Sequence, residues 1–237
     1  MCKVFKYLIS LCVILISLPG FSSIADTTTV IDDIFNFDFR KADIKLLEIG
    51  KEDSFMAEAM KLEVRWWEAV SSDDKAMFKS FEEDIAQFDK QFGDPVSDLI
   101  ISTYKIRYYS AIHRYYILPL LFFRVNHEIN DLDIHECKSL GRDEYELIKL
   151  YKSIFLLIEG SWLPFYKTPE YDQENQLKNI EYIISNGSSS NRSIGTYLLM
   201  KYYLEVEKNR SKAMPYLSEL HSKYPNNKIF IQLLTNY

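Results

Sequence analysis

The chain has 237 residues, of which 47% are hydrophobic and 26% are charged, and its formal net charge is −6. A chain of this length can bury a sizeable core as one domain. Its acidic balance gives no general attraction to nucleic acid, so we expect no nucleic-acid partner.

The first 25 residues have the layout of a secretory signal peptide. Lys3 and Lys6 precede an apolar run at 7–18, and small residues lead to a cleavage site after Ala25. The run is shorter than the roughly 20 residues that a membrane span needs, although an uncleaved anchor is the alternative. Cleavage would leave a single domain at 26–237 with no transmembrane span. We therefore expect export to the periplasm, the cell envelope or the extracellular space.

Cleavage also changes the charge and the cysteine content of the chain. The formal charge moves from −6 to −8, because the removed segment carries two lysines and no acidic residue. Cys137 is then the one cysteine left, so no disulfide can form within the mature chain.

Apolar residues recur at intervals of three and four through most of the chain, which predicts an all-α protein. Strand-like alternation is hard to find, and only 7 Gly and 7 Pro interrupt the pattern. The expected helices lie at 30–35, 40–49, 54–70, 73–92, 95–123, 144–158 and 172–186. Pro119 should kink or end the fifth of these, with 120–123 continuing into a buried turn. We expect an aromatic loop at 162–171 and a flexible turn at 186–193.

Residues 193–230 predict the clearest helical hairpin. Tyr197, Met200 and Leu204 line one face of its first helix, and Ala213, Leu217 and Leu220 line one face of its second. Ser211 is the expected N-cap of the second helix, and Pro225 ends that helix because proline lacks an amide donor.

This hairpin resembles a tetratricopeptide repeat, a 34-residue helix-turn-helix unit. The resemblance is best at Tyr197, Ala213 and Pro225, and Tyr224 to Phe230 looks like the repeat junction of exported bacterial proteins of this family. Lys201, Lys208 and Leu220 depart from the pattern, which implies looser packing. The resemblance implies stacked antiparallel hairpins in a right-handed solenoid, with a concave groove for a peptide or protein. A compact helical bundle would share the same local patterns.

Tyrosines and basic residues alternate along 95–123 and suggest the lining of such a groove. A stripe of this kind could bind an extended peptide or an acidic segment. Trp66 falls on a core stripe, whereas Trp67 lies one step off it and should be partly exposed. The candidate partner-binding residues are Trp67, Lys105, Arg107, Tyr109, Arg114 and Tyr202. The alternative is that the tyrosines pack between helices and the arginines are solvated.

A second cluster suggests metal chemistry. His127, Asp131 and His135 are four residues apart, so one helix would align them near Cys137, and these residue types suit zinc. Several Asn and Asp residues weaken a helix here, and no zinc-binding spacing signature is present. A solvated polar segment is the alternative.

The sequence contains no catalytic motif: the nucleophile elbow, the P-loop and the dinucleotide-binding fingerprint are all missing. We therefore expect a non-enzymatic interaction or scaffolding module without catalytic residues or cofactors. Two alternatives are an exported helical metal-binding protein or hydrolase that uses the His127 cluster, and a structural subunit of an envelope complex. Association with a membrane through a partner is compatible with all three.

Overall fold

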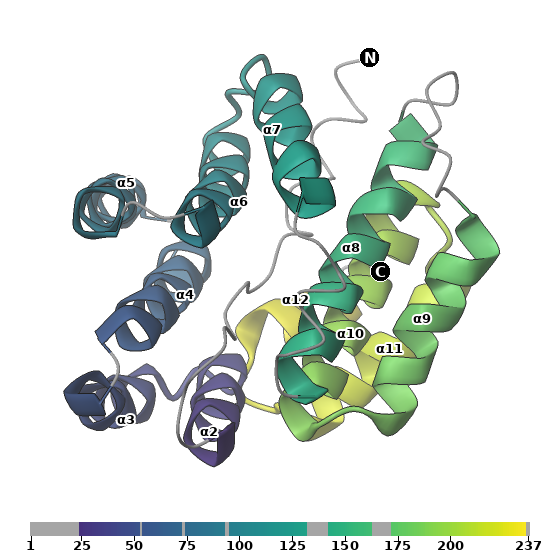
Figure 1. Ribbon diagram of the computed structural model, residues 1–237. Coiled ribbons are helices and arrows are strands. Elements are labelled where there is room, and N and C mark those ends of the chain that lie inside the picture. The colour runs from purple at the N-terminus through teal and green to yellow at the C-terminus, as the bar shows by residue number, and fades with distance from the viewer. Residues whose placement is uncertain are drawn as a thin grey trace.

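The computed structural model describes residues 24–52, 54–72, 74–92, 95–131, 142–162 and 172–235. Every regular element in these ranges is a helix, which confirms the all-α prediction (Figure 1). In the same ranges, no helix combines the length and the apolar character that a bilayer-spanning segment requires.

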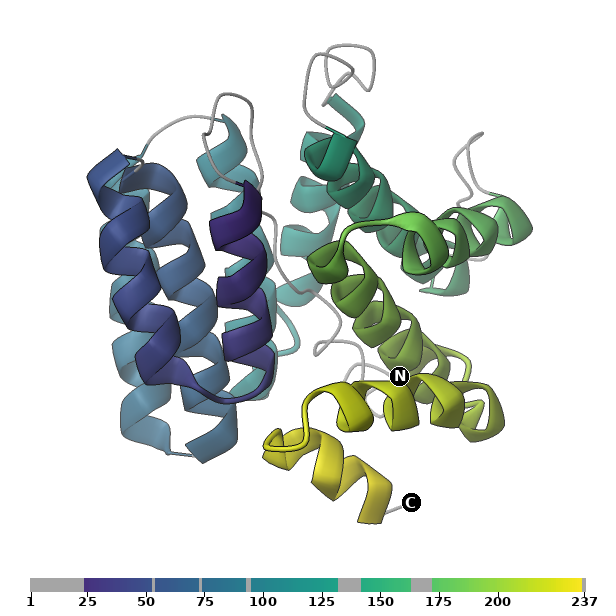
Figure 2. The same cartoon turned by 90° about the horizontal axis from the view of Figure 1, so that it is seen from below.

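The first six helices of the described ranges pack against one another in chain order. They are α2 (Ile24–Phe35), α3 (Phe39–Glu52), α4 (Ser54–Ser72), α5 (Lys75–Gln91), α6 (Pro95–Ala111) and α7 (Leu118–Asp131). Figure 2 shows the purple and blue helices, α2 to α5, side by side with nearly parallel axes. The predicted hairpins at 30–49 and 54–92 therefore form, with boundaries within a few residues of those expected.

The remaining helices form a second group. They are α8 (Arg142–Trp162), α9 (Gln173–Asn186), α10 (Ser189–Lys201), α11 (Arg210–Lys223) and α12 (Lys228–Thr235), with a π-helical turn, η3 (Tyr202–Val206), after α10. Helix α10 lies at the centre of this group, because it packs against α8, α9 and α11.

Side-chain caps set several helix starts. Asp74, Asp172 and Ser188 accept hydrogen bonds from the first-turn amides of α5, α9 and α10, respectively. Because Ser188 caps α10, the predicted flexible turn at 186–193 is wrong beyond Ser188, and the remaining residues begin the helix. The N-cap of α11 is Asn209 and not Ser211, whose hydroxyl donates to Asn209 Oδ1 at 2.8 Å.

Two other predicted boundaries are wrong. Helix α6 ends at Ala111, after which the backbone reverses through His113, whose φ is 62°. Pro119 then falls in the first turn of α7, where a missing amide proton leaves no helical bond unmade. Helix α8 continues through Gly160 to Trp162, and the rest of the predicted aromatic loop, 163–171, lies outside the described residues.

The beginning of the described chain packs against its end. Helix α2 contacts α10, so the path differs from a linear stack in which each hairpin touches only its sequence neighbours. Five buried aromatic rings form this junction, here called the closing cluster: Phe35, Trp67, Tyr197, Tyr224 and Phe230. Ring centroids lie 5.3 Å apart for Phe35 and Tyr224, and 5.6 Å apart for Trp67 and Tyr197.

Polar contacts reinforce the closing cluster. The Asn227 amide donates to the Phe35 carbonyl at 2.8 Å, and the Tyr224 hydroxyl donates to Asp32 Oδ1 at 2.5 Å. These bonds satisfy the carbonyl and the carboxylate at the end of α2. The turn that closes the predicted hairpin therefore also fastens the first described helix.

Candidate functional site

Three of the six predicted partner-binding residues lie in the core. The exposed fractions are 1% for Trp67, 0% for Arg107 and 1% for Tyr202, so a partner cannot touch these side chains in this structure. Trp66 is also buried, as expected, but the predicted partial exposure of Trp67 is wrong. Arg107 can be buried because a buried carboxylate binds its guanidinium group.

Glu63 of α4 is the centre of a buried polar network. Its carboxylate accepts two hydrogen bonds from the Arg107 guanidinium, at 2.5 and 3.1 Å. It also accepts one from the Tyr104 hydroxyl at 2.8 Å and one from Trp67 Nε1 at 2.6 Å. The Arg107 guanidinium lies over the Trp66 ring, 4.5 Å from its centroid. The two carboxylate oxygens of Glu63 thus accept four hydrogen bonds in total. They have no capacity left to accept a hydrogen bond from a ligand.

Electrostatics hold this network in one protonation state. Burial opposes the charge on Arg107, but the neighbouring Glu63 carboxylate outweighs it and raises the Arg107 pKa. Burial and the same carboxylate raise the pKa of Tyr104 well above its ordinary value. Arg107 therefore stays charged and Tyr104 stays neutral at physiological pH. The network ties α4 to α6 and is a structural element.

Tyr202 opens the π-helical turn η3. Its hydroxyl accepts a hydrogen bond from Gln173 of α9 at 3.4 Å. Beside it, Lys201 forms an ion pair with Glu205, and both side chains are largely buried. The carboxylate compensates the buried ammonium group, and the looser packing predicted at Lys201 stays a prediction.

The other three predicted residues lie near the end of α6 and the turn that follows. Lys105 is half-buried and pairs with Asp89 of α5 at 3.3 Å. Tyr109 is half-buried, and its carbonyl accepts a hydrogen bond from the Arg114 amide at 2.7 Å. Arg114 is exposed, and its guanidinium forms no ion pair within the described ranges. Of the three, Arg114 lies two residues before Tyr116, where an exposed apolar surface begins.

Helix α7 and the turn before it carry apolar side chains on two opposite faces. Leu118, Phe122 and Val125 are buried against the core. Tyr116, Leu120 and Phe123 face the other way, with exposed fractions of 80%, 75% and 51%. These last three residues are here called the α7 surface. Leu120 and Phe123 share one face of α7 because they are three residues apart, and Tyr116 lies in the turn before the helix. The expectation of a buried turn at 120–123 is wrong for Leu120 and Phe123.

The predicted metal cluster lies mostly outside the described structure. His127 is exposed on α7 and Asp131 is the last residue of that helix, whereas His135 and Cys137 lie outside the described residues. No group of three side chains that could hold a metal ion occurs in the part of the chain that is described. The metal-binding alternative remains a prediction.

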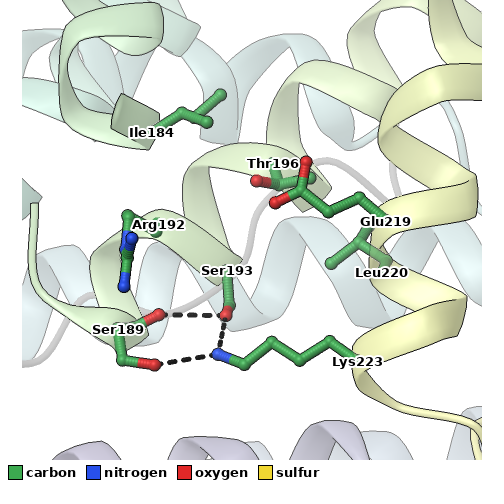
Figure 3. A pocket seen from close by; sticks show the side chains of 8 residues that line it. All are labelled: Ile184, Ser189, Arg192, Ser193, Thr196, Glu219, Leu220 and Lys223. Carbon is green, nitrogen blue, oxygen red and sulfur yellow. Dashed lines mark hydrogen bonds between the residues drawn. The ribbon is translucent and has the colours of Figure 1, made fainter. Parts of the chain in front are cut away.

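A pocket that the sequence did not reveal lies between α9, α10 and α11 (Figure 3). Its volume is about 240 Å³. Its polar lining consists of Ser189, Arg192, Ser193 and Thr196 from α10, and Glu219 and Lys223 from α11. The spacing of these residues on each helix was a usable signal, but their meeting depends on how α10 and α11 pack.

Comparisons with protein-family models, with curated proteins and with solved structures find no match to this chain.

Proposed function

We propose that the chain is a non-enzymatic protein-interaction or scaffolding module, exported to the cell envelope or the secreted space. The observation that carries this proposal is the α7 surface. A helix that is apolar on both faces is normally covered on both, but the apolar face of α7 that carries Leu120 and Phe123 is exposed, as is Tyr116 in the turn before it. A partner that covers them would remove these side chains from water.

The proposal includes degenerate tetratricopeptide-like hairpins as the scaffold. The hairpin formed by α10 and α11 supports this, because it places the aromatic Tyr197 and the small Ala213 in the core and ends just before Pro225. In this proposal the repeats form a solenoid that the contact between α2 and α10 closes.

The charges around the α7 surface favour an acidic partner segment that carries apolar side chains. Arg114 and Arg124 are exposed beside it. Arg124 pairs with Asp98 at 3.6 Å, with both side chains about half exposed, and a pair of this kind is weak enough for a partner carboxylate to displace. Burial of the apolar side chains would supply affinity, and the two arginines would supply selectivity.

The experiment is in-cell crosslinking of the full chain in the compartment outside the cytoplasm, followed by identification of the crosslinked segment. The test variant replaces Leu120 and Phe123 with Ser. The matched control replaces Ile44 and Leu47 of α3 with Ser, since these residues are also exposed and apolar, at 56% and 70%. Circular dichroism checks that both variants fold.

We expect an acidic partner segment that the wild type and the α3 variant capture and the α7 variant loses. A synthetic peptide of that segment should bind more weakly to an Arg114→Glu variant and at higher salt. Capture that both double variants retain, or a basic segment, would contradict the proposal. Concentration-dependent self-association that the α7 variant abolishes would instead make the occupant a second copy of this chain.

A further inference from the structure

The pocket between α9, α10 and α11 lies in the second group of helices, away from the residues of the α7 surface. One face of α10 lines it, because Ser189, Arg192, Ser193 and Thr196 are spaced by three or four residues. Glu219 and Lys223, one turn apart on α11, line the opposite side (Figure 3). The pocket therefore combines hydroxyl groups with charges of both signs.

The hydrogen bonds in the pocket show which donors remain for a ligand. The Ser193 hydroxyl accepts from Lys223 at 2.8 Å. Because Tyr224 gives its single proton to Asp32, the Ser193 proton is directed to the Ser189 carbonyl at 2.9 Å and the Tyr224 hydroxyl oxygen at 2.6 Å, so the Ser193 hydroxyl is fully used. The Ser189 hydroxyl oxygen accepts from Lys223 at 2.9 Å, and its own proton remains to be donated. Arg192 is exposed at the rim and forms no ion pair in the described part of the chain.

Thr196 supplies the second indication of a ligand. Its side chain is only 1% exposed, yet its hydroxyl has no hydrogen-bond partner within the described structure. A buried hydroxyl without a partner is unfavourable, because it has lost its bonds to water. Figure 3 shows this hydroxyl turned toward the side of the pocket where Ile184 and Arg192 lie. An acceptor atom in the pocket would satisfy it.

Arg192, Ser189 and Thr196 thus offer donors from one face of α10, and the first two lie in its first turn, at the positive end of the helix dipole. Lys223 adds a second positive charge, which Asp32 of α2 holds at 3.1 Å. A phosphoryl group has three terminal oxygens and can accept from Arg192 and Thr196 at once, because these residues are one turn apart on one face of α10. The volume of about 240 Å³ would hold roughly eight waters at about 30 Å³ each, which is more than a bare phosphate fills.

We propose that this pocket binds a small phosphomonoester that carries an amino group. Arg192 and Thr196 hold the phosphoryl oxygens. Glu219 faces the amino group of the ligand. The positive charge of this group compensates the Glu219 carboxylate, which would otherwise repel the phosphate. This binding site is independent of the partner surface on α7, so either can exist without the other.

The test is isothermal titration calorimetry of the full chain at low salt with two probes, phosphoethanolamine and inorganic phosphate. We expect phosphoethanolamine to bind more tightly, and the Glu219→Gln variant to abolish this preference. Arg192→Gln should weaken phosphoethanolamine binding by about tenfold or more, because it removes a charged hydrogen-bond donor. Thr196→Val keeps the shape of the side chain and should weaken binding by roughly threefold to tenfold.

The matched control is Arg210→Gln, which makes the same charge change at the other end of α11. It should leave the affinity within about twofold of the wild type. Equal losses in the Arg192 and Arg210 variants would overturn the site, since binding would then follow net charge alone. Tighter binding of inorganic phosphate than of phosphoethanolamine would overturn the proposal that the ligand is an ester. If neither probe gives heat of binding at about 10 mM, a concentration above the Kd of ordinary metabolite sites, the whole proposal would be overturned.

Discussion

Glu63 and Arg107 are 44 residues apart in the sequence, yet their charged groups meet at 2.5 Å and neither side chain is exposed to solvent. Such a pair is costly to break from one side, because the remaining charge stays buried without its counterion. Tyr104 and Trp67 donate to the same carboxylate, so its removal would also leave two donors unsatisfied.

Arg107→Met should therefore lower the free energy of unfolding by about 3–5 kcal/mol, measured by urea denaturation. The control is Arg65→Met on α4, whose partner Glu68 is partly exposed, and it should cost less than about 1 kcal/mol. A Glu63→Leu, Arg107→Met double variant should lose less than the sum of the two single variants. Simple additivity would show that the two residues do not interact energetically.

Tyr224 links α2 to the turn after α11 through Asp32 and Ser193. Tyr224→Phe removes both bonds and should lower the free energy of unfolding by about 1–3 kcal/mol at neutral pH. Tyr182→Phe is the control, because that ring is 55% exposed, and it should change stability by less than about 0.5 kcal/mol. Similar losses in the two variants would contradict the role of this link.

The same residue makes stability depend on alkaline pH. Burial and the hydrogen bond to Asp32 raise the pKa of Tyr224 above its ordinary value of 10.0. Above pH 10 the unfolded chain releases this proton while the folded chain keeps it, so the free energy of unfolding falls as pH rises. The contribution is about 1.4 kcal/mol per pH unit. Urea unfolding between pH 9 and 11 should show a shallower decline in Tyr224→Phe than in the wild type.

Phe230 joins the last helix to the closing cluster, with its ring centroid 6.3 Å from that of Phe35 and 6.1 Å from that of Tyr197. Phe230→Ala should cost about 3–5 kcal/mol because it opens a cavity in a fully buried site. Hydrogen exchange should also quicken in α2, which would lose contacts with the far end of the chain. The neighbouring Ile231→Ala is the control and should cost less than about 1 kcal/mol, since Ile231 is 39% exposed.

Helix capping gives a test within one turn. Asn209 accepts a hydrogen bond from the Lys212 amide at 3.2 Å, so Asn209→Ala should lower stability by about 1 kcal/mol. Ser211→Ala should lower stability by only about a few tenths of a kcal/mol, because the Ser211 hydroxyl bonds to the Asn209 side chain and not to a backbone amide. If thermal unfolding showed a larger loss of stability for Ser211→Ala than for Asn209→Ala, Ser211 would be the N-cap.

The local features of the fold could be predicted from the sequence. Periodicity located most of the helices, and Asp172 and Pro225 marked boundaries that the structure keeps, because caps and proline act on their immediate neighbours. The ends of α6 and α8 were placed wrongly. An apolar run over 112–123 can continue a helix or turn, and only tertiary packing decides between them.

The candidate site was harder to predict, since it depends on pairs of distant residues. Arg107 has the spacing of the core residues Ile100 and Tyr104, and Glu63 has the spacing of Ala59 and Trp66. Two opposite charges on two apolar stripes were therefore a signal for a buried pair. Nothing local indicates that α4 and α6 would bring them together. The pocket at Thr196 likewise requires the relative placement of α10 and α11.

The contact between Asn227 and Phe35 spans 192 residues, which has a consequence for synthesis. A ribosome adds roughly 5–20 residues per second, so α2 emerges about 10–40 s before the turn that fastens it exists. Phe35 and its neighbours remain without that partner during this interval, and entropy delays contacts between distant residues further. The end of α2 is therefore the part of the chain that a chaperone has most time to bind before folding is complete.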